Sequence, residues 1–258
     1  MRLDRALARD VRTGLRSWPL RLFLLLQLVA AAVFVWRRGE EVIDTIVLIW
    51  LGMLVLAFLA WWAGRYPSAH PQPDRVSAAG ARAVFALVGA AGLTMWGFGW
   101  AAFGLVLLSA GLGGWIWAAW RTGGPSDLRA RLTRDPRPFL PMMLLIALPK
   151  LLAIGPSFVV GAVLALPSGL GQQLFYLVGL FAPLEAASRR PAAAAVVAAL
   201  VFALIHVPFN FEANDDDLLA AVANALLWQA SVGLIAVLAY RRHRAVVPIG
   251  VTHALAIG

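Results

Sequence analysis

Long hydrophobic runs constrain this chain more than any other feature of its sequence. In the N-terminal half they cover residues 18–36, 42–62 and 83–120. About 20 predominantly apolar residues are enough for a helix that crosses the hydrocarbon core of a bilayer. Of the 258 residues, 61% are hydrophobic and 14% are charged, whereas about a quarter of the residues in a soluble domain are charged. The sequence therefore predicts an all-α, polytopic transmembrane helix bundle.

The formal net charge of +9 does not indicate a nucleic-acid-binding protein. The basic residues are nearly all arginines at the ends of hydrophobic runs, and they form no patch with interleaved aromatic residues. This distribution is typical of the positive-inside bias, and some arginines are expected to contact lipid headgroups. The expected partner is therefore the lipid bilayer, and no nucleic-acid partner is expected. The absence of cysteine excludes disulfides, thiolate metal sites and thiol catalysis.

The hydrophobic runs predict about eight spans, preceded by an N-terminal interfacial helix. Apolar residues recur at every fourth position of residues 1–16, which favours an amphipathic helix in the headgroup region over a solvated basic tail. Pro149 and Pro156 are expected to break the fifth span, and residues 167–171 are expected to form a turn. The predicted spans are 18–36, 42–62, two within 83–120, 139–166, 172–188, 192–207 and 218–240, followed by a last apolar segment at 246–258.

The arginine-rich loops predict the orientation of these spans. With eight spans, loops 64–82, 121–138, 189–190 and 241–244 all fall on one side of the membrane. Basic loops face the cytoplasm, so the N-terminus is expected there too. Residues 1–138 would then form N-terminal membrane helices joined by basic cytoplasmic loops.

Two histidines, His206 and His253, lie inside hydrophobic runs near the C-terminus. An imidazole in hydrocarbon is costly and therefore a candidate for a functional site, although an interhelical hydrogen bond is the ordinary alternative. Antiparallel spans should place Gln172, Gln173 and His206 at a similar depth. His253 follows Val246 by seven residues, or ~10 Å of helix. It can meet His206 only if a helix is tilted, broken or re-entrant.

Glu185 is the one acidic residue of the predicted sixth span. It follows Gln172 by 13 residues, which is ~20 Å along a helix axis. We therefore expect an ion pair with Arg189 and Arg190 near the membrane surface rather than a contact with His206.

Four other polar residues fall within or beside the predicted spans. Asn224 and Gln229 are expected to make interhelical hydrogen bonds. Asp44 lies close enough to a membrane edge to reach water. Lys150 is compatible both with extension to the membrane surface and with a place in a cavity.

Three pieces of the C-terminal half resemble a known family. They are Phe202-Ala-Leu-Ile-His206, the helix end Gly233-Leu-Ile-Ala-Val-Leu-Ala-Tyr-Arg-Arg242, and Val247-Pro-Ile-Gly-Val-Thr-His-Ala254. This set resembles the CPBP family, the CAAX-protease and bacteriocin-processing intramembrane proteins, whose eukaryotic members are type II CAAX prenyl endopeptidases. The resemblance covers roughly residues 140–258. It implies an intramembrane protease-type helical core at 139–258.

The family has three motifs: Glu-Glu-x-x-x-Arg, Phe-x-x-x-His, and a histidine followed four residues later by Asn or Asp. Phe202 and His206 match the second motif, and His253 matches the third. By spacing, the first motif falls on Gln172 and Gln173. The expected arginine and the expected Asn or Asp are replaced by Leu177 and Ile257. An alternative frame on Glu185 and Arg190 lies too close to His206.

The resemblance implies a glutamate that acts as general base on a water, with histidines that stabilise the oxyanion. The resemblance therefore makes four residues the candidates for catalysis: Gln172, Gln173, His206 and His253. A glutamine can orient a water but cannot accept its proton. A metal has also been proposed for the family, yet two histidines without a carboxylate are too few ligands for zinc. No cofactor is therefore expected.

Three functions are compatible with the sequence. The family implies an intramembrane endopeptidase acting on a membrane peptide or protein, in a bacterial-type plasma membrane. The chemistry of the altered motifs favours a pseudoenzyme, a protease-like membrane scaffold that binds a partner. The third is a transporter-like bundle, whose flux would depend on Asp44 or Lys150.

Overall fold

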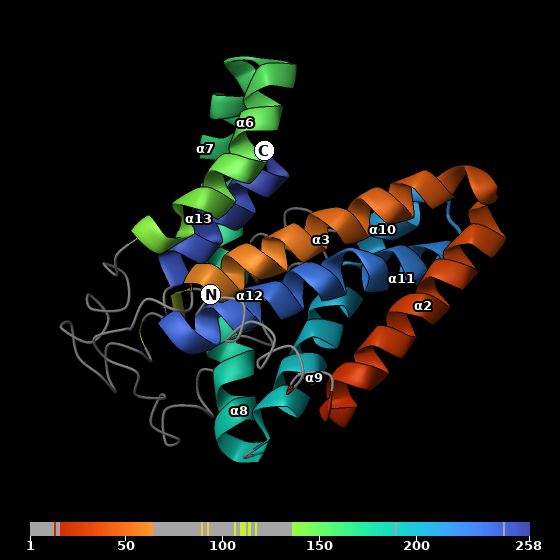
Figure 1. Cartoon of the computed structure of the whole chain (residues 1–258). Coiled ribbons are helices and arrows are strands. Elements are labelled where there is room, and N and C mark those ends of the chain that lie inside the picture. The colour runs from red at the N-terminus through yellow and green to blue at the C-terminus, as the bar shows by residue number, and fades with distance from the viewer. Residues whose placement is uncertain are drawn as a thin grey trace, which may run out of the picture.

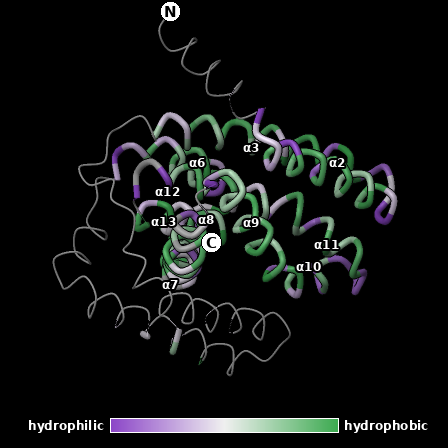
Figure 2. The backbone as a smooth tube through the Cα atoms, turned by 90° about the horizontal axis from the view of Figure 1, so that it is seen from below, coloured by the Kyte–Doolittle hydropathy of each residue, from purple (hydrophilic) through white to green (hydrophobic). Residues whose placement is uncertain are grey.

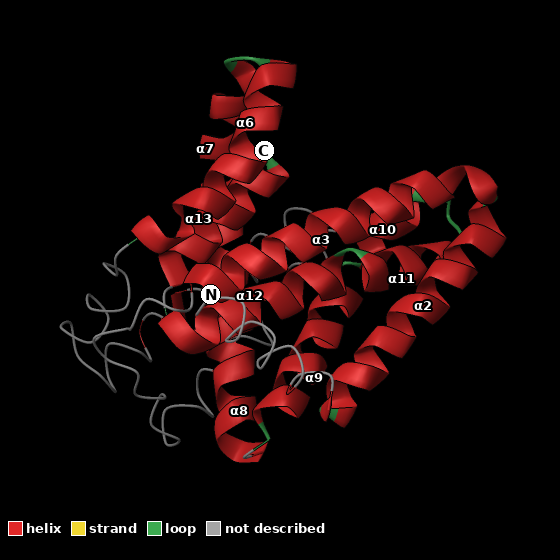
Figure 3. Ribbon diagram, in the orientation of Figure 1, coloured by secondary structure: helices red, strands yellow, loops and turns green. Residues whose placement is uncertain are grey.

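The computed structural model describes residues 16–63, 136–188, 190–244 and 246–258, together with isolated positions between 13 and 117. These residues form helices and short loops without strands, which confirms the all-α prediction (Figure 3). Four described helices are long and apolar enough to span a membrane, or up to six if each bent pair counts as one span. The eight-span prediction is not tested, because helix 1–16 and the spans within 83–120 lie almost wholly outside the described residues.

The first two described helices confirm two predicted spans. Helix α2 covers Trp18–Arg38 and α3 covers Ile43–Ala63. Gly39 joins them, at φ 87°, with the short 3₁₀ turn η1 at Glu40–Val42. A residue without a Cβ adopts this positive φ readily, so the chain reverses there. Figure 2 shows hydrophobic residues along the helices and hydrophilic residues mainly near their ends, as a bilayer requires.

The predicted fifth span breaks at Pro156, as expected, but not at Pro149. After the 3₁₀ turn η2 (Arg137–Phe139), α6 runs over Leu140–Ile154 and passes Pro149 without a break. The chain reverses at Gly155, whose φ of 69° favours glycine, and α7 follows at Ser157–Gln173. Helices α6 and α7 therefore form a hairpin rather than one broken crossing (Figure 1).

The turn predicted at 167–171 is also wrong, because α7 stays helical through it. The segments Ser157–Leu166 and Ser168–Phe181 meet at an angle of 42°. The helix then widens into a π-helix, η3, at Leu174–Phe181 and ends in α8, Ala182–Ser188. Gln172 thus lies inside a long bent helix, not at the beginning of a span.

The last five helices return through the bundle. Helix α9 (Pro191–Leu204) is separated from α10 (Val207–Ala213) by a 45° bend at Ile205 and His206. Helices α11 (Leu218–Leu227) and α12 (Gln229–His243) form one candidate span, and α13 (Val246–Ile257) is a shorter apolar helix. Helix α12 packs on α9 and α3, α11 packs on α2, and α13 packs most extensively on α7.

Ion pairs join the helix ends at two places. Arg37 and Arg38, which end α2, contact Asp217 and Asp215 before α11, each at 2.6 Å. These residues therefore share one end of the bundle. In the second group, Glu185 of α8 contacts Arg241 at 2.8 Å and Arg244 at 2.7 Å.

The predicted partners of Glu185 were different. Among the described residues its ion pairs are with Arg241 and Arg244 rather than Arg190, while Arg189 lies outside the described residues. The error arose because the folded chain brings the end of α12 beside α8. The end of α12 nevertheless lies beside α8, which precedes Arg190, so Arg241 and Arg244 are on the same side of the bundle as α8.

Acid should weaken the contact between α2 and α11. Asp217 caps α11 by accepting the N–H groups of Leu219 and Ala220, and Arg37 contacts the same carboxylate. The Ala220 N–H first, and then Arg37, lower the pKa of Asp217. A lowered pKa stabilises the fold above the ordinary aspartate pKa of about 3.9, and this stability is lost as the pH falls through the lowered value.

Asp217→Asn keeps a capping oxygen but removes the charge. We expect a lower melting temperature than wild type at pH 7 in lipid nanodiscs, and convergence of the two proteins as the pH falls below the lowered pKa of Asp217. Asp216→Asn, which leaves the Arg37 contact intact, is the matched control. A pH-independent difference for Asp217→Asn would contradict the electrostatic explanation.

Candidate functional site

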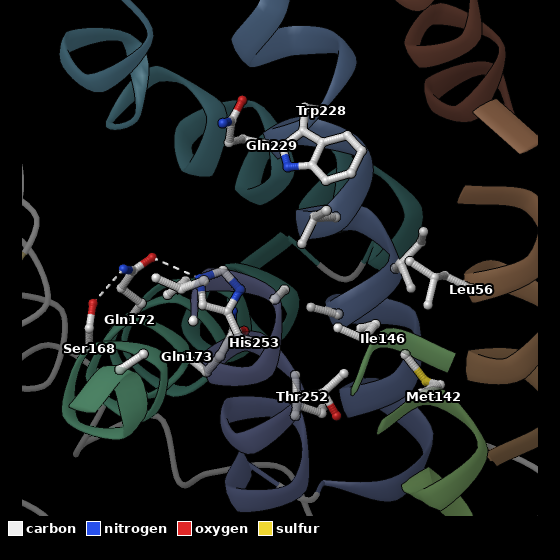
Figure 4. Close-up of a pocket in the computed structure, with 18 of the residues that line it drawn as sticks. Leu56, Met142, Ile146, Ser168, Gln172, Gln173, Trp228, Gln229, Thr252 and His253 are labelled. Atoms are coloured by element: carbon white, nitrogen blue, oxygen red, sulfur yellow. Dashed lines mark hydrogen bonds between the residues drawn. The ribbon is translucent and has the colours of Figure 1, made fainter. Parts of the chain in front are cut away.

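Three of the four candidate catalytic residues come together. The Oε1 position of Gln172 lies 3.2 Å from Nε2 of His206 and 3.1 Å from Nε2 of His253. The other end of the Gln172 amide contacts Ser168 Oγ at 3.0 Å. Figure 4 shows Gln172 between Ser168 and His253. One glutamine amide thus connects α7, the α9–α10 junction and α13.

A helix break resolves the difference in depth that the sequence predicted between the histidines. His206 stands in the bend between α9 and α10, where the helix axis turns by 45°. Its Nδ1 lies 2.6 Å from the carbonyl oxygen of Phe202, one turn earlier, and the Phe202 ring packs on the imidazole at 4.5 Å between centroids. The imidazole is therefore fixed in orientation with Nε2 directed at Gln172.

The Phe202 contact determines the protonation of His206. A carbonyl oxygen only accepts, so Nδ1 carries a proton and Nε2 of a neutral imidazole is an acceptor. If the amide oxygen of Gln172 faces Nε2 of His206, then Nε2 must carry a proton as well as Nδ1, and the imidazole is positively charged. An amide turned by 180° would donate its two N–H groups to both Nε2 atoms and accept from Ser168. Glutamine therefore supports two neutral histidines, which a carboxylate cannot do because it only accepts.

Close packing of α7 on α13 places His253 beside Gln172. A Cβ at Gly169 would lie 2.7 Å from both the backbone N of Ala254 and the carbonyl oxygen of Gly250. Only a residue without a side chain permits this approach of two backbones. Gly169 precedes Gln172 by three residues, and Gly250 precedes His253 by three. Each glycine thus shares a helix face with the polar residue that follows it.

An asparagine pair supports the bend at His206. The side chain of Asn210 donates to the carbonyl oxygen of His206 at 2.9 Å, and the backbone N–H of Asn210 donates to the same oxygen at 3.1 Å. Asn224 of α11 donates to Oδ1 of Asn210 at 3.0 Å. The interhelical hydrogen bond expected of Asn224 is therefore confirmed, and it connects α11 to the bend that carries His206.

Gln173, the fourth candidate, does not join this group. Its side chain is fully buried, and neither amide atom has a hydrogen-bond partner among the described residues. The buried Leu177 stands where the family pattern has an arginine, so a carboxylate at position 173 would lack that partner.

The oxygen of Gln229 also has no partner in the described part of the chain, so its expected interhelical bond is not seen there.

The three contacting residues face a cavity of about 870 Å³. Most of its wall is apolar, for example Met53 of α3, Met142 of α6 and Ile235 of α12. The cavity is also lined by Gln173, Gln229, Ile257 and Lys150, whereas no described aspartate or glutamate lines it.

The contact of Ser168 with Gln172 was not predicted from the sequence, because residues 157–173 were not predicted as one helix. In a single helix its four-residue spacing from Gln172 would have indicated the contact.

The donor set does not fit a divalent metal. Two imidazole nitrogens and one amide oxygen lack the carboxylate or third nitrogen of a catalytic zinc site. In the described ranges, no group of three or more His, Cys, Asp or Glu side chains is placed to hold a metal ion.

A family model matches the C-terminal part of the chain. Residues 154–256 match the family model described as type II CAAX prenyl endopeptidase Rce1-like. The matched region begins at the end of α6 and extends through almost all of α13, and it contains Gln172, His206 and His253. No curated protein and no solved structure matches the chain.

A methyl group at Gly169 should separate α7 from α13. Its nearest contacts are backbone atoms, which cannot rotate away, so we expect Gly169→Ala to lower the free energy of unfolding by about 1–3 kcal/mol. Gly171→Ala, on the same helix with nothing within 4 Å of its Cβ, should be neutral or stabilising. Thermal unfolding in nanodiscs measures both, and equal effects would contradict the packing role assigned to Gly169.

Proposed function

We propose that this chain, whose residues 154–256 match the type II CAAX prenyl endopeptidase Rce1-like family model, binds an apolar peptide segment within the membrane and hydrolyses it poorly or not at all. It would then act as a protease-like scaffold rather than an efficient endopeptidase. The helices are those of an integral membrane protein. The arginine-rich loops favour a cytoplasmic N-terminus, and we place the protein in a bacterial-type plasma membrane.

The observation that carries the proposal is the amide of Gln172 between both histidines. Peptide hydrolysis by an activated water needs a group that accepts the water's proton near neutral pH. The family resemblance puts a glutamate in this position, and an amide has no comparable basicity. In the neutral arrangement His206 and His253 direct their Nε2 atoms at Gln172, so neither is free to act as the base.

The cavity supports binding of a peptide. Its volume of about 870 Å³ suits several side chains, and its mainly apolar wall suits hydrophobic ones. Ser168 and the Gln172 amide supply hydrogen-bonding groups to one side of that wall. A peptide offers apolar side chains and a polar main chain together, which fits this distribution.

Gln172→Glu tests the proposal directly. The substitution keeps the shape of the side chain and puts a carboxylate within hydrogen-bond reach of both Nε2 atoms. We expect wild type to cleave a co-reconstituted apolar peptide slowly or not at all, and Gln172→Glu to be roughly 10²–10⁴-fold faster, the usual contribution of a general base. Cleavage is followed by mass spectrometry of the liposomes.

Gln173→Glu is the matched control. It adds the same charge at the next residue, where the side chain is buried and does not contact the histidines, so we expect lower thermal stability and no activity. Rapid wild-type cleavage that His206→Ala abolishes would contradict the proposal and favour an active endopeptidase. Solute flux without peptide binding would favour the transporter-like bundle.

A further inference from the structure

Two buried polar side chains beside Gln172 make no hydrogen bond in the described part of the chain. Gln173 is fully buried and Tyr176 is 4% exposed. Both amide atoms of Gln173 and the hydroxyl of Tyr176 are unpaired there. Buried polar groups in folded proteins are nearly always paired, either with protein or with ordered water. Two such side chains so close together therefore indicate a site for a small polar ligand.

Helix geometry puts the two side chains on one face. Gln173 precedes Tyr176 by three residues, a spacing at which side chains on a helix are neighbours. Gln173 ends α7, and Tyr176 lies in the π-helix η3, a rare form that often occurs at functional sites. Gln173 also lines the cavity (Figure 4), which gives a small molecule access to this face.

Apolar groups of α9 and α12 surround the Tyr176 hydroxyl. A Cβ at Gly233 of α12 would lie 3.0 Å from Tyr176 Oη and 3.2 Å from Cδ1 of Phe202. The rings of Tyr176 and Phe202 are 4.6 Å apart between centroids. An O–H buried among such groups is costly unless it forms a hydrogen bond.

The chemistry of this face favours a neutral ligand. Helices α7, η3 and α9 contain no charged residue, so an ion bound here would lack a counter-charge. Gln173 offers an amide oxygen and two N–H donors, and the Tyr176 hydroxyl both donates and accepts. A buried water typically forms about three hydrogen bonds to groups of this kind. It also bridges groups that are too far apart for a direct contact.

We propose that a buried water binds between the Gln173 amide and the Tyr176 hydroxyl and stabilises the junction of α7 with η3. This water site is separate from the Gln172 amide, which contacts Ser168, His206 and His253. It goes beyond the proposed peptide binding and does not depend on it.

X-ray footprinting tests for the water directly. Brief irradiation of the full chain in phosphatidylcholine nanodiscs converts bound water to hydroxyl radicals, which hydroxylate the side chains in contact with it. Mass spectrometry locates the label after transfer to heavy-oxygen water for different times. We expect hydroxylation of the buried Tyr176, with heavy oxygen appearing there later than at Trp36, which is 70% exposed. Phe181, fully buried without a polar group, is the internal control and should stay unlabelled.

Two substitutions test the hydrogen bonds of the water. Tyr176→Phe keeps the ring and removes the hydroxyl. We expect it to abolish the slow label at position 176 and to lower the melting temperature by about 2–4 °C, because the water loses a partner. Gln173→Leu, of similar volume, should abolish the slow label on Tyr176. Since both residues bind one water, the melting temperature of the double variant should fall by less than the sum of the single losses.

The other outcomes overturn the inference. An unlabelled Tyr176 in wild type would show that no water contacts it. Heavy oxygen appearing as early at Tyr176 as at Trp36 would show exchanging cavity water rather than a bound molecule. A higher melting temperature of Tyr176→Phe would show that the hydroxyl is buried without a partner. A slow label that survives in Gln173→Leu would separate Gln173 from the water.

Discussion

The close approach of α7 and α13 is the constraint on which the site depends. Gly169 and Gly250 bring two backbones nearer than side chains would allow, and each helix carries a polar residue three positions further on. Helix association in a bilayer lacks a hydrophobic driving force and depends on such close packing. Without it His253 would not reach the Gln172 amide that His206 also contacts.

The sequence predicted the fold best where a single signal dominated. Long apolar runs correctly predicted α2 and α3, because the length of a span follows from the thickness of the bilayer. Prediction failed at Pro149 and Gly155, where two local signals compete. A proline was expected to break the helix, yet α6 continues through Pro149 and the positive φ of Gly155 reverses the chain. Only the packing of α6 and α7 on α13 decides between these possibilities.

Part of the site could be predicted from helix geometry. Antiparallel spans placed Gln172 and His206 at one depth, and the two side chains do meet. The approach of His253 could not be predicted, because it depends on a 45° bend at His206 and on the close packing of α13. Asn210 and Asn224, which support that bend, carry no local signal beyond being amides in an apolar helix.

The amide at position 172 and the ammonium of Lys150 are linked through the charge of the cavity. The resemblance puts a glutamate where Gln172 stands, and a carboxylate there would oppose the positive charge of Lys150, which lines the same cavity. With glutamine, the described lining keeps Lys150 and gains no acidic residue. The amide therefore changes two properties of the site together: it removes the base that the resemblance implies, and it leaves a positive charge without an acidic side chain in the described lining.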